Sequence, residues 1–389
     1  MANRIMLNQT SYHGAGAIAE IATEAKAHGF KKALVCSDPD LIKFNVTSKV
    51  TDILDKEGLA YEIYSDIKAN PTIENVQHGV QAFKNSGADY IIAIGGGSSM
   101  DTSKAIGIII ANPEFEDVRS LEGVAPTKNP CVPIIAVPTT AGTAAEVTIN
   151  YVITDVEKKR KFVCVDSHDM PVIAVVDPEM MSSMPKGLTA STGMDALTHA
   201  VEAYIGNSTT PGTRKNALDA VQLIFENLDT AYTDGQNIEA RRNMLRASYF
   251  AGCAFTKSYV GYVHAVAHSL GGKYNVPHGL ANAVILPMVL ETYGDSITHK
   301  LRNLAVTAKL CDKHEDDKTA ARIFIDAVKD MKKRFDIGDY IPEIQETDIP
   351  ELAHYADKEA NPLYPVPVLM DAGELETLYY RLMPPAGNC

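Results

Sequence analysis

The chain changes its pattern of apolar residues near Pro185, and this change limits the folds open to it. Before that residue, short runs rich in β-branched residues alternate with stretches of helical periodicity. Several runs are apolar throughout, as expected of strands that are covered on both faces. Alternating strands and helices predict βαβ units and a mostly parallel sheet. We expect strands over residues 33–36, 60–64, 90–94, 134–137, 162–165 and 172–176.

The rest of the chain has helical periodicity and no further run typical of a strand. Two apolar stripes recur at spacings of three and four residues, as on one face of a helix. We interpret both as core packing, and they comprise Leu218, Val221, Phe225 and Leu228, then Ala321, Phe324, Val328, Met331 and Phe335. The sequence therefore predicts an α/β domain over residues 1–185 and an all-helical domain over residues 186–389. We expect a ligand in the cleft between two such halves.

Composition excludes several classes of function. The chain of 389 residues has a formal net charge of −13, which argues against a nucleic-acid surface. No apolar run reaches the length of about 18 residues that a membrane-spanning helix needs, and the first residues have no signal-peptide pattern. The six cysteines are scattered without a C-x-x-C pair. We therefore expect reduced thiols and a cytoplasmic protein.

Five acidic and imidazole side chains recur at spacings typical of a metal site. Asp195 and His199, and again His264 and His268, stand four residues apart, which puts each pair on one helix face. His278 follows in a Pro-His-Gly segment that opens the next helix. One carboxylate and several imidazoles suit Fe²⁺, Zn²⁺, Mn²⁺ or Ni²⁺, and the lack of thiolates disfavours a closed structural zinc site. A single such histidine is more typical of an ordinary polar residue, but the joint pattern favours a metal.

A glycine-rich turn follows the strand expected over residues 90–94. Gly95-Gly96-Gly97-Ser98 leads directly into an apolar helix, so backbone N–H groups and the helix N-terminus could cradle a phosphate. The turn matches neither the P-loop nor the G-x-G-x-x-G pattern. A tight turn between strand and helix that binds no ligand is the equal alternative.

Two further segments have polar residues where a dinucleotide could bind. Threonines at 139, 140 and 143 lie in a turn after a buried strand and could contact a pyrophosphate or ribose. Thr143 could instead form a capping box with Glu146. Asp38 ends the first strand, where an acid can bind the adenosine ribose and repel a 2′-phosphate, which favours NAD over NADP. Helix capping is an equally good account of Asp38.

Taken in order, these motifs resemble the iron-containing (group III) alcohol dehydrogenases. The resemblance rests on the Gly95–Ser98 turn, on Pro138-Thr139-Thr140-Ala141-Gly142-Thr143-Ala144-Ala145-Glu146, and on the sets Asp195/His199 and His264/His268/His278. It runs along nearly the whole chain. It implies an N-terminal dinucleotide-binding α/β domain followed by an all-helical, metal-binding domain, the architecture also found in dehydroquinate synthase. It further implies a homodimer through the N-terminal strand.

The resemblance also assigns a role to each residue of the histidine pattern. It implies that His268 lies beside the nicotinamide, as the catalytic residue, and does not bind the metal. The metal, Fe²⁺ with Zn²⁺ as the alternative, would be bound by Asp195, His199, His264 and His278.

The same resemblance places residues near NAD and near the substrate. Asn150, Val165 and Phe255 would line the substrate pocket. The residues implied for NAD are Asp38, Asn70, Gly96, Gly97, Ser98, Thr139, Thr140, Thr143 and Lys161.

The activity implied by the resemblance is the reversible reduction of a small aldehyde to a primary alcohol with NADH. Residues 1–4, 112–115, 118–123, 147–155 and 161–166 are most similar to family members that interconvert L-lactaldehyde and L-1,2-propanediol; of these, residues 1–3 lie outside the part of the chain that the structure describes. The alternatives are related alcohols and diols: 1,3-propanediol, butanol or ethanol. The segment Asp357–Pro362 departs from those members, which have a cysteine before a Gly-Gly-Asn-Pro turn.

Two other classes of protein share parts of this pattern. A dehydroquinate-synthase-like enzyme would need several cations to hold a phosphorylated substrate, whereas the cations between residues 190 and 280 fall mostly on expected helix surfaces. A scaffold protein would bind metal and NAD without turnover. Such a protein has no reason to carry both the metal-ligand pattern and the cofactor-binding turns. We therefore expect a small aldehyde or alcohol as the binding partner, with no nucleic acid and no membrane.

Overall fold

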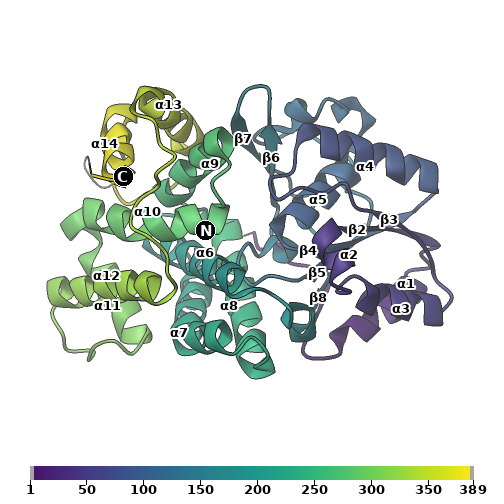
Figure 1. Ribbon diagram of the computed structural model, residues 1–389, viewed down its shortest axis with the longest axis horizontal. Helices are drawn as coiled ribbons and strands as arrows, with labels where there is room; N and C mark the ends of the chain where they lie inside the picture. Colours follow the sequence, from purple (N-terminus) through teal and green to yellow (C-terminus); the bar gives the residue numbers. More distant parts are fainter. Residues whose placement is uncertain (1–3, 386–389) are drawn as a thin grey trace. The chain divides into compact units, whose positions relative to one another are not determined.

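The computed structural model describes residues 4–385, and these form two compact units. The first unit comprises the described residues up to Pro185 together with Asp234–Leu245. The second comprises Lys186–Thr233 and the described residues from Arg246 onward. Figure 1 shows the strands in the first unit, drawn in purple to blue, and helices throughout the second, drawn in green to yellow. Among the described residues, the last strand ends at Val176, which confirms the predicted change of pattern near Pro185.

The first unit is built on a six-stranded sheet in which every pair of neighbours is parallel. The strand order is β1-β8-β5-β4-β2-β3. The strands are β1 (Thr10–His13), β2 (Lys32–Ser37), β3 (Ala60–Tyr64), β4 (Tyr90–Gly95), β5 (Ile134–Pro138) and β8 (Ile173–Val176). The connecting helices are α1 (Glu20–Ala27), α2 (Pro39–Lys43), α3 (Ser48–Lys56), α4 (Ile73–Ser86) and α5 (Gly97–Ala111), with short 3-10 turns η1 (Ala17–Ala19), η2 (Pro113–Phe115), η3 (Val118–Leu121), η4 (Ala145–Val147) and η5 (Pro178–Met181).

Helices cover both faces of this sheet, as the apolar strands predict. Side chains of a strand point alternately to its two faces, so Leu34 of β2 packs with α4 and α5 while its neighbour Val35 packs with α1 and α3. Figure 1 shows α4 and α5 on one side of the strands and α1 and α3 on the other. Because neither face is open to water, even the fully apolar strand β4 is stable here.

A separate two-stranded sheet corrects one detail of the sequence prediction. Residues 162–165 do form a strand, β7 (Arg160–Val165), but it pairs antiparallel with β6 (Asn150–Asp155) and lies outside the parallel sheet. Only residues 156–159 connect the two strands, and so short a connection can join antiparallel strands but no parallel ones. The pattern of apolar residues did not indicate β6 or the four-residue strand β1 at the end of the sheet, although the family resemblance did imply an N-terminal strand.

The second unit is helical. Its helices are α6 (Lys186–Ile205), α7 (Pro211–Thr233), α8 (Ile238–Ser258), α9 (Tyr262–Tyr274), α10 (His278–Tyr293), α11 (Thr298–Thr307), α12 (Asp317–Arg334), α13 (Ile349–Ala360) and α14 (Ala372–Leu382), with 3-10 turns η6 (Gly294–Ile297) and η7 (Glu346–Asp348). The first residues of α8 belong to the other unit. The predicted stripes of α7 and α12 pack inward: Val221, Leu228, Phe324 and Val328 are all fully buried. None of the described helices combines the length and the apolar character that crossing a membrane requires.

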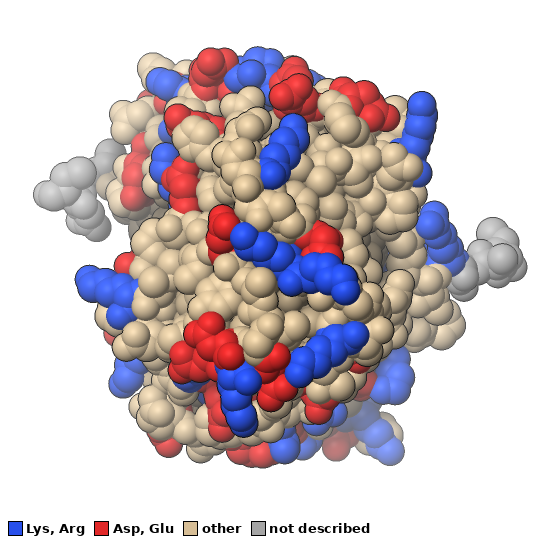
Figure 2. All heavy atoms as spheres, turned by 90° about the vertical axis from the view of Figure 1, so that its right-hand side faces the viewer, with Lys and Arg blue, Asp and Glu red and all other residues tan. Residues whose placement is uncertain are grey.

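Acidic and basic side chains are interspersed on the face of the molecule that Figure 2 shows. Several pairs of opposite charge are in contact in the first unit, among them Lys26 with Glu57 and Lys32 with Glu62, each at 2.6 Å. Exposed pairs of this kind contribute little to stability, typically about 0–1 kcal/mol. On this face the charges gather into no broad patch of one sign.

Candidate active site

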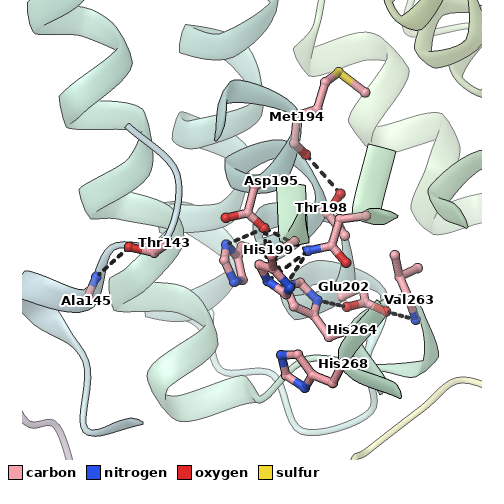
Figure 3. A network of polar contacts seen from close by, with 12 residues as sticks. Thr143, Ala145, Met194, Asp195, Thr198, His199, Glu202, Val263, His264 and His268 are labelled. Atoms are coloured by element: carbon pink, nitrogen blue, oxygen red, sulfur yellow. Dashed lines mark hydrogen bonds and ion pairs between the residues drawn. The ribbon is translucent and has the colours of Figure 1, made fainter. Parts of the chain in front are cut away.

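Three helices of the second unit bring the predicted histidine pattern together. Asp195 and His199 lie one turn apart on α6, His264 on α9, and His278 is the first residue of α10. Every residue of α6 from Gly193 to Ile205 is buried, so its polar side chains must find partners inside the protein. Figure 3 shows Asp195, His199 and His264 converging on one point.

One oxygen of Asp195 lies at the centre of this cluster. Its Oδ1 lies 3.5 Å from Nε2 of His278, 3.8 Å from Nε2 of His264 and 3.9 Å from Nδ1 of His199. Ligand atoms of Asp195, His199 and His264 all lie within 4.8 Å of one another, as one metal ion would require. The four residues that the resemblance predicts as metal ligands are therefore neighbours. Three of them, Asp195, His199 and His264, have ligand atoms within 4.8 Å of one another, and His278 lies 3.5 Å from Asp195.

Ring stacking fixes the orientation of the imidazoles. The ring of His199 stacks on Phe255 of α8, with centroids 4.2 Å apart and planes at 14°, and also lies 4.3 Å from the ring of His264. The ring of His268 stacks on that of His278 at 5.1 Å and 17°. Phe255, expected to line the substrate pocket, thus lies directly against a predicted metal ligand.

The pKa values of Asp195 and His264 show that the interior of the cluster stabilises positive charge. Burial alone would raise the pKa of Asp195, but the facing imidazoles of His199, His278 and His264 lower that pKa well below its usual range. Burial would lower the pKa of His264, whereas hydrogen bonds to Asp195 and Glu202 raise it to about 9. Both shifts have one cause, a buried anion that needs cationic neighbours.

Glu202, one turn further along α6 from His199, holds the ring of His264. Its Oε2 lies 2.5 Å from Nδ1 of His264, and its Oε1 accepts a hydrogen bond from the backbone N–H of Val263 at 2.9 Å. Because a carboxylate only accepts, Nδ1 donates, which leaves Nε2 on the side of Asp195 as the nitrogen that would bind a cation once its own hydrogen is lost. A Cβ on Gly261 would lie 2.8 Å from Oε1, so glycine is needed for this approach. Carboxylate, histidine and metal commonly form such a chain in metal sites.

The contacts of Asn282, one turn into α10, indicate whether the cluster could hold a cation. Its Nδ2 donates to Oδ1 of Asp195 at 2.7 Å and lies 3.2 Å from Nε2 of both His264 and His278. One electropositive group therefore contacts three electron-pair donors at once. One carboxylate with imidazole nitrogens is also a donor set that binds Fe²⁺ or Zn²⁺. The residues present fit a divalent metal ion.

In the first unit, most of the predicted cofactor residues follow the carboxyl ends of three adjacent strands. The neighbours β5, β4 and β2 end at Pro138, Gly95 and Ser37. From β2 the chain goes outward to β3, then returns to β4 on the other side of β2. The carboxyl ends of β2 and β4 are therefore a topological switch point, where open α/β sheets bind their ligands.

The two predicted turns pack closely on one another there. Gly95 has φ of +152°, and a Cβ on it would lie 2.2 Å from Oγ of Ser99. A Cβ on Gly97, at the start of α5, would lie 2.9 Å from Cγ2 of Thr143 in the second turn. Side chains at these glycines would push the turns apart, so bare backbone N–H groups remain at the N-terminus of α5, where an anion can bind.

The structure gives local partners to several predicted cofactor residues. Oδ1 of Asp38 accepts from the backbone N–H groups of Asp40 and Leu41 at 3.0 Å, so Asp38 does cap α2. Ser98 donates to the carbonyl of Ala69, next to the predicted Asn70. Asp38 is half-buried, and its capping bonds use only one of its two carboxylate oxygens.

The capping box considered for Thr143 does not form. Oγ1 of Thr143 accepts from the backbone N–H of Ala145 at 3.4 Å, and residues 145–147 form only a 3-10 turn. The residue that precedes this turn is Ala144, and no side chain caps the turn. Thr139 is buried next to this turn, while Thr140 is half-buried.

The remaining predicted residues of the first unit lie on the β6–β7 hairpin. Asn150 and Val165 are direct cross-strand partners, so these two positions predicted for the substrate pocket are neighbours. Lys161 lies on β7 and lowers the pKa of the buried Asp101 by its charge, although burial raises that pKa to about 7 overall. Gly96 is the residue that precedes α5.

Comparison with known proteins agrees with this geometry along the whole chain. Residues 8–178 match the family described as "Iron-containing alcohol dehydrogenase", and residues 189–383 match "Fe-containing alcohol dehydrogenase family, C-terminal". The chain belongs to the iron-containing alcohol dehydrogenase family. It is 46% identical over 358 residues to lactaldehyde reductase of Escherichia coli K12, covering 92% of this chain and 93% of that protein. It is 38% identical over 363 residues to 1,3-propanediol dehydrogenase of Citrobacter freundii, covering 92% of each.

Solved structures of this dehydrogenase family have the same fold. A 1,3-propanediol oxidoreductase, 36% identical, superimposes with a TM-score of 0.93 and covers 98% of this chain and 100% of its own. The alcohol dehydrogenase from Oenococcus oeni, 34% identical, also gives a TM-score of 0.93 with the same coverage. The predicted fold class, an α/β domain followed by a helical one, is confirmed.

Sequence reasoning missed four side chains around the histidines of this dehydrogenase. Glu202 and Asn282 could have been found, because they follow His199 and His278 by three and four residues and so share a helix face with them. Of the other two, Glu359 contacts His268 and Tyr364 contacts Glu359, and both lie more than 90 residues further along the chain. No periodicity within one helix could have indicated that contact.

Proposed function

We propose that this member of the family is an NAD-linked aldehyde reductase and alcohol dehydrogenase that uses one divalent metal, Fe²⁺ or Zn²⁺. The observation that carries the proposal is the buried carboxylate of Asp195 facing three imidazoles within 3.5–3.9 Å. Such a carboxylate favours a bound cation. Asp195, His199, His264 and His278 would hold the ion.

The bound ion supplies a Lewis acid that polarises a carbonyl oxygen. The chain itself provides orientation, which in well-placed reactants can be worth on the order of several kcal/mol. Glu202 keeps Nε2 of His264 as an electron-pair donor, and the stacking of His199 on Phe255 keeps that ring in place. His268, stacked on His278, is the proposed catalytic residue beside the nicotinamide.

We propose that the first unit binds NAD along the ends of β2, β4 and β5. Backbone N–H groups at Gly96, Gly97 and Ser98 are suited to the pyrophosphate, and Asp38 to the adenosine ribose. The reduced nicotinamide of NADH, when bound, would supply the hydride for aldehyde reduction, and NAD⁺ would accept it in the reverse direction. The other residues proposed to lie near NAD are Asn70, Thr139, Thr140, Thr143 and Lys161.

For the substrate, we propose L-lactaldehyde, reduced to L-1,2-propanediol, with Asn150, Val165 and Phe255 lining the pocket. The support is the 46% identity to a lactaldehyde reductase. The second candidate is 1,3-propanediol, favoured by the likeness to 1,3-propanediol dehydrogenases in sequence and in structure. The two substrates differ in whether the second hydroxyl is adjacent to the reacting carbon, so a direct comparison separates them.

We further propose a cytoplasmic homodimer that pairs through its N-terminal strand. In support, β1 stands at the end of the sheet order and pairs with β8 alone among the described strands. An unpaired strand edge is a template for another chain. Sedimentation velocity of the wild-type chain tests the dimer, and a monomer at micromolar concentration would contradict it.

The test of the proposed function is NADH oxidation by protein purified without oxygen. The chain is stripped with a chelator and then reconstituted with Fe²⁺ or Zn²⁺. L-Lactaldehyde, 3-hydroxypropanal, propanal and glyceraldehyde are compared at several concentrations, and NADPH replaces NADH in a parallel series. We expect turnover that needs metal, prefers NADH and has the highest kcat/KM with L-lactaldehyde.

Each other result has a defined meaning. A higher kcat/KM with 3-hydroxypropanal would keep the metal-dependent reaction and replace the substrate by the 1,3-diol pair. If the metal-free chain turned over aldehyde as fast as the reconstituted chain, the proposed metal-binding role of the Asp195 cluster in turnover would be contradicted. No turnover with any metal and any aldehyde would overturn the proposed function as a whole.

A further inference from the structure

His268 is held by a carboxylate that belongs to none of the predicted motifs. Glu359 lies in the last turn of α13, and its Oε1 lies 2.8 Å from Nδ1 of His268. The hydroxyl of Tyr364, five residues further on, donates to the same oxygen at 2.8 Å. Two side chains from different parts of the second unit therefore meet on one oxygen of Glu359.

This contact fixes which nitrogen of His268 carries the hydrogen. A carboxylate has no hydrogen to donate, so Nδ1 must be the donor and carry the N–H. In the neutral ring, Nε2 is then left with its lone pair and can only accept. Among residues 4–385, no hydrogen bond to Nε2 competes for that lone pair.

Glu359 is itself anchored. Burial, and then the charge of Glu359, raise the pKa of Tyr364 well above its usual value, so the hydroxyl stays protonated and remains a donor. The side chains of His268 and Glu359 are only 9% and 17% exposed. Helix geometry does not account for a carboxylate in this position, because the C-terminal end of a helix disfavours negative charge. The two donors are what hold it there.

We propose that Glu359 is a positioning residue that keeps His268 in the Nδ1–H tautomer with its ring stacked on His278, so that Nε2 serves as the acceptor toward the bound reactants. The proposal rests on the proposed function, in which His268 lies beside the nicotinamide. Tyr364 completes the arrangement by holding the carboxylate in place. Stacking on His278 limits the plane of this ring but does not select the nitrogen that carries the hydrogen, and the carboxylate of Glu202 bonds a different histidine.

The experiment compares Zn²⁺-reconstituted wild type with Glu359→Ala, Glu359→Gln and Tyr364→Phe. The matched control is Glu351→Gln, which also removes a carboxylate of α13 that bonds a residue of α9, here Lys273 at 2.6 Å, away from His268. Four quantities are measured: zinc content, thermal midpoint, kcat and KM, and the ¹⁵N signals of the histidine rings. The signals of His268 are assigned with His268→Gln.

We expect wild type to give one Nδ1–H pattern for His268. Glu359→Ala should lose that pattern and lower kcat by roughly 10–100-fold, as loss of an outer partner of a site histidine commonly does, with zinc content unchanged. Glu359→Gln keeps an acceptor oxygen and should recover part of kcat. Tyr364→Phe should lower kcat less than Glu359→Ala does, and Glu351→Gln should stay within about twofold of wild type.

Two results would overturn the proposal. One is an unchanged Nδ1–H pattern in Glu359→Ala with kcat within twofold of wild type. The other is a loss of kcat that matches the loss of zinc or is equalled by Glu351→Gln, since either would make the role merely structural. Failure of the proposed function would look different: the wild type would turn over no aldehyde, while its ring signals would still report the tautomer.

Discussion

Two buried aspartates, one in each unit, respond to burial in opposite ways. Asp195 in the helical unit is 1% exposed, and the imidazoles that face it lower its pKa well below the usual range. Asp169 in the α/β unit is 0% exposed, and burial raises its pKa to about 8. Neither oxygen of Asp169 has a hydrogen-bond partner among the described residues.

The difference comes from what faces each carboxylate. The nearest cation to Asp169 is Lys104 at 4.0 Å, and that ammonium group already donates to the carbonyls of Thr148 and Asn150. Asp195 instead has three imidazoles arranged around one oxygen. Burial by itself makes an acid neutral, whereas burial together with converging electron-pair donors makes a cation site. Only the second arrangement is suited to a metal.

The largest expected effect comes from removing the charge of Asp195. Asp195→Asn keeps the shape of the side chain but leaves the ion without its only anionic ligand. Loss of one partner from a buried charge pair costs about 3–5 kcal/mol, so we expect at least a hundredfold weaker metal binding and a parallel loss of turnover. Equilibrium dialysis with Zn²⁺ measures the affinity. Asp169→Asn is the matched control and should bind metal like wild type; equal affinities in both variants would remove the distinction between the two acids.

A smaller effect is expected when the support of the cluster is weakened and its ligands are kept. Glu202→Gln retains an oxygen near Nδ1 of His264 but loses the charge that holds this ring. Such outer partners commonly contribute about 10–100-fold to metal affinity or activity. Competition against a chelator of known affinity measures the change. A Glu202→Gln variant with wild-type affinity would mean that the four predicted ligands need no such support.

A third acid, Asp38, is only half-buried and so extends the comparison to a carboxylate near the surface. Asp38→Asn keeps the helix cap, since asparagine and aspartate cap equally well, but it removes the charge that would repel a 2′-phosphate. Repulsion near the surface is on the order of 1 kcal/mol, so the preference for NADH over NADPH in kcat/KM should fall roughly fivefold. The thermal midpoint should not change. Asp40→Asn, two residues away, is the control, and an unchanged preference in Asp38→Asn would leave that residue with its capping role alone.

The last effect concerns stability instead of binding or turnover, and it comes from the titration of Asp169. Its pKa is about 8 when folded and near 3.8 when unfolded, so between these values the folded chain holds a proton that the unfolded chain has released. Stability therefore falls as pH rises through this window, by at most about 1.4 kcal/mol per pH unit for one proton. Asp169→Asn should show a flatter decline of the thermal midpoint from pH 5 to 8. Asp52→Asn, which alters an exposed acid, should follow wild type; parallel curves for Asp169→Asn would show that Asp169 is charged when folded.

Much of this fold follows from local pattern. The strands β2, β4 and β5 are apolar on both faces because helices cover both faces, and that can be predicted from composition alone. The four-residue spacings of Asp195/His199 and His264/His268 follow from helix geometry. The strand β1 was missed because its sequence, Thr-Ser-Tyr-His, contains no apolar run, whereas the equally short β8 is apolar throughout.

The rest depends on contacts between segments far apart in the sequence. Glu359 bonds His268 across 91 residues, and Lys104 reaches Thr148 across 44. Residues 162–165 have the composition of a buried strand, yet they pair with β6 because the connection between the two strands is short. Such contacts depend on how helices and strands pack in three dimensions. Local patterns in a single sequence therefore cannot predict them.

The central claim is that the histidine cluster binds the metal on which turnover depends. The most direct test is His264→Ala, because His264 faces Asp195 and is held by Glu202. The variant and wild type are reconstituted without oxygen, and bound metal per chain is measured together with NADH oxidation by an aldehyde. The account predicts about one ion per chain and turnover in wild type, and loss of both together in His264→Ala. A His264→Ala variant that keeps its metal and full activity would contradict it.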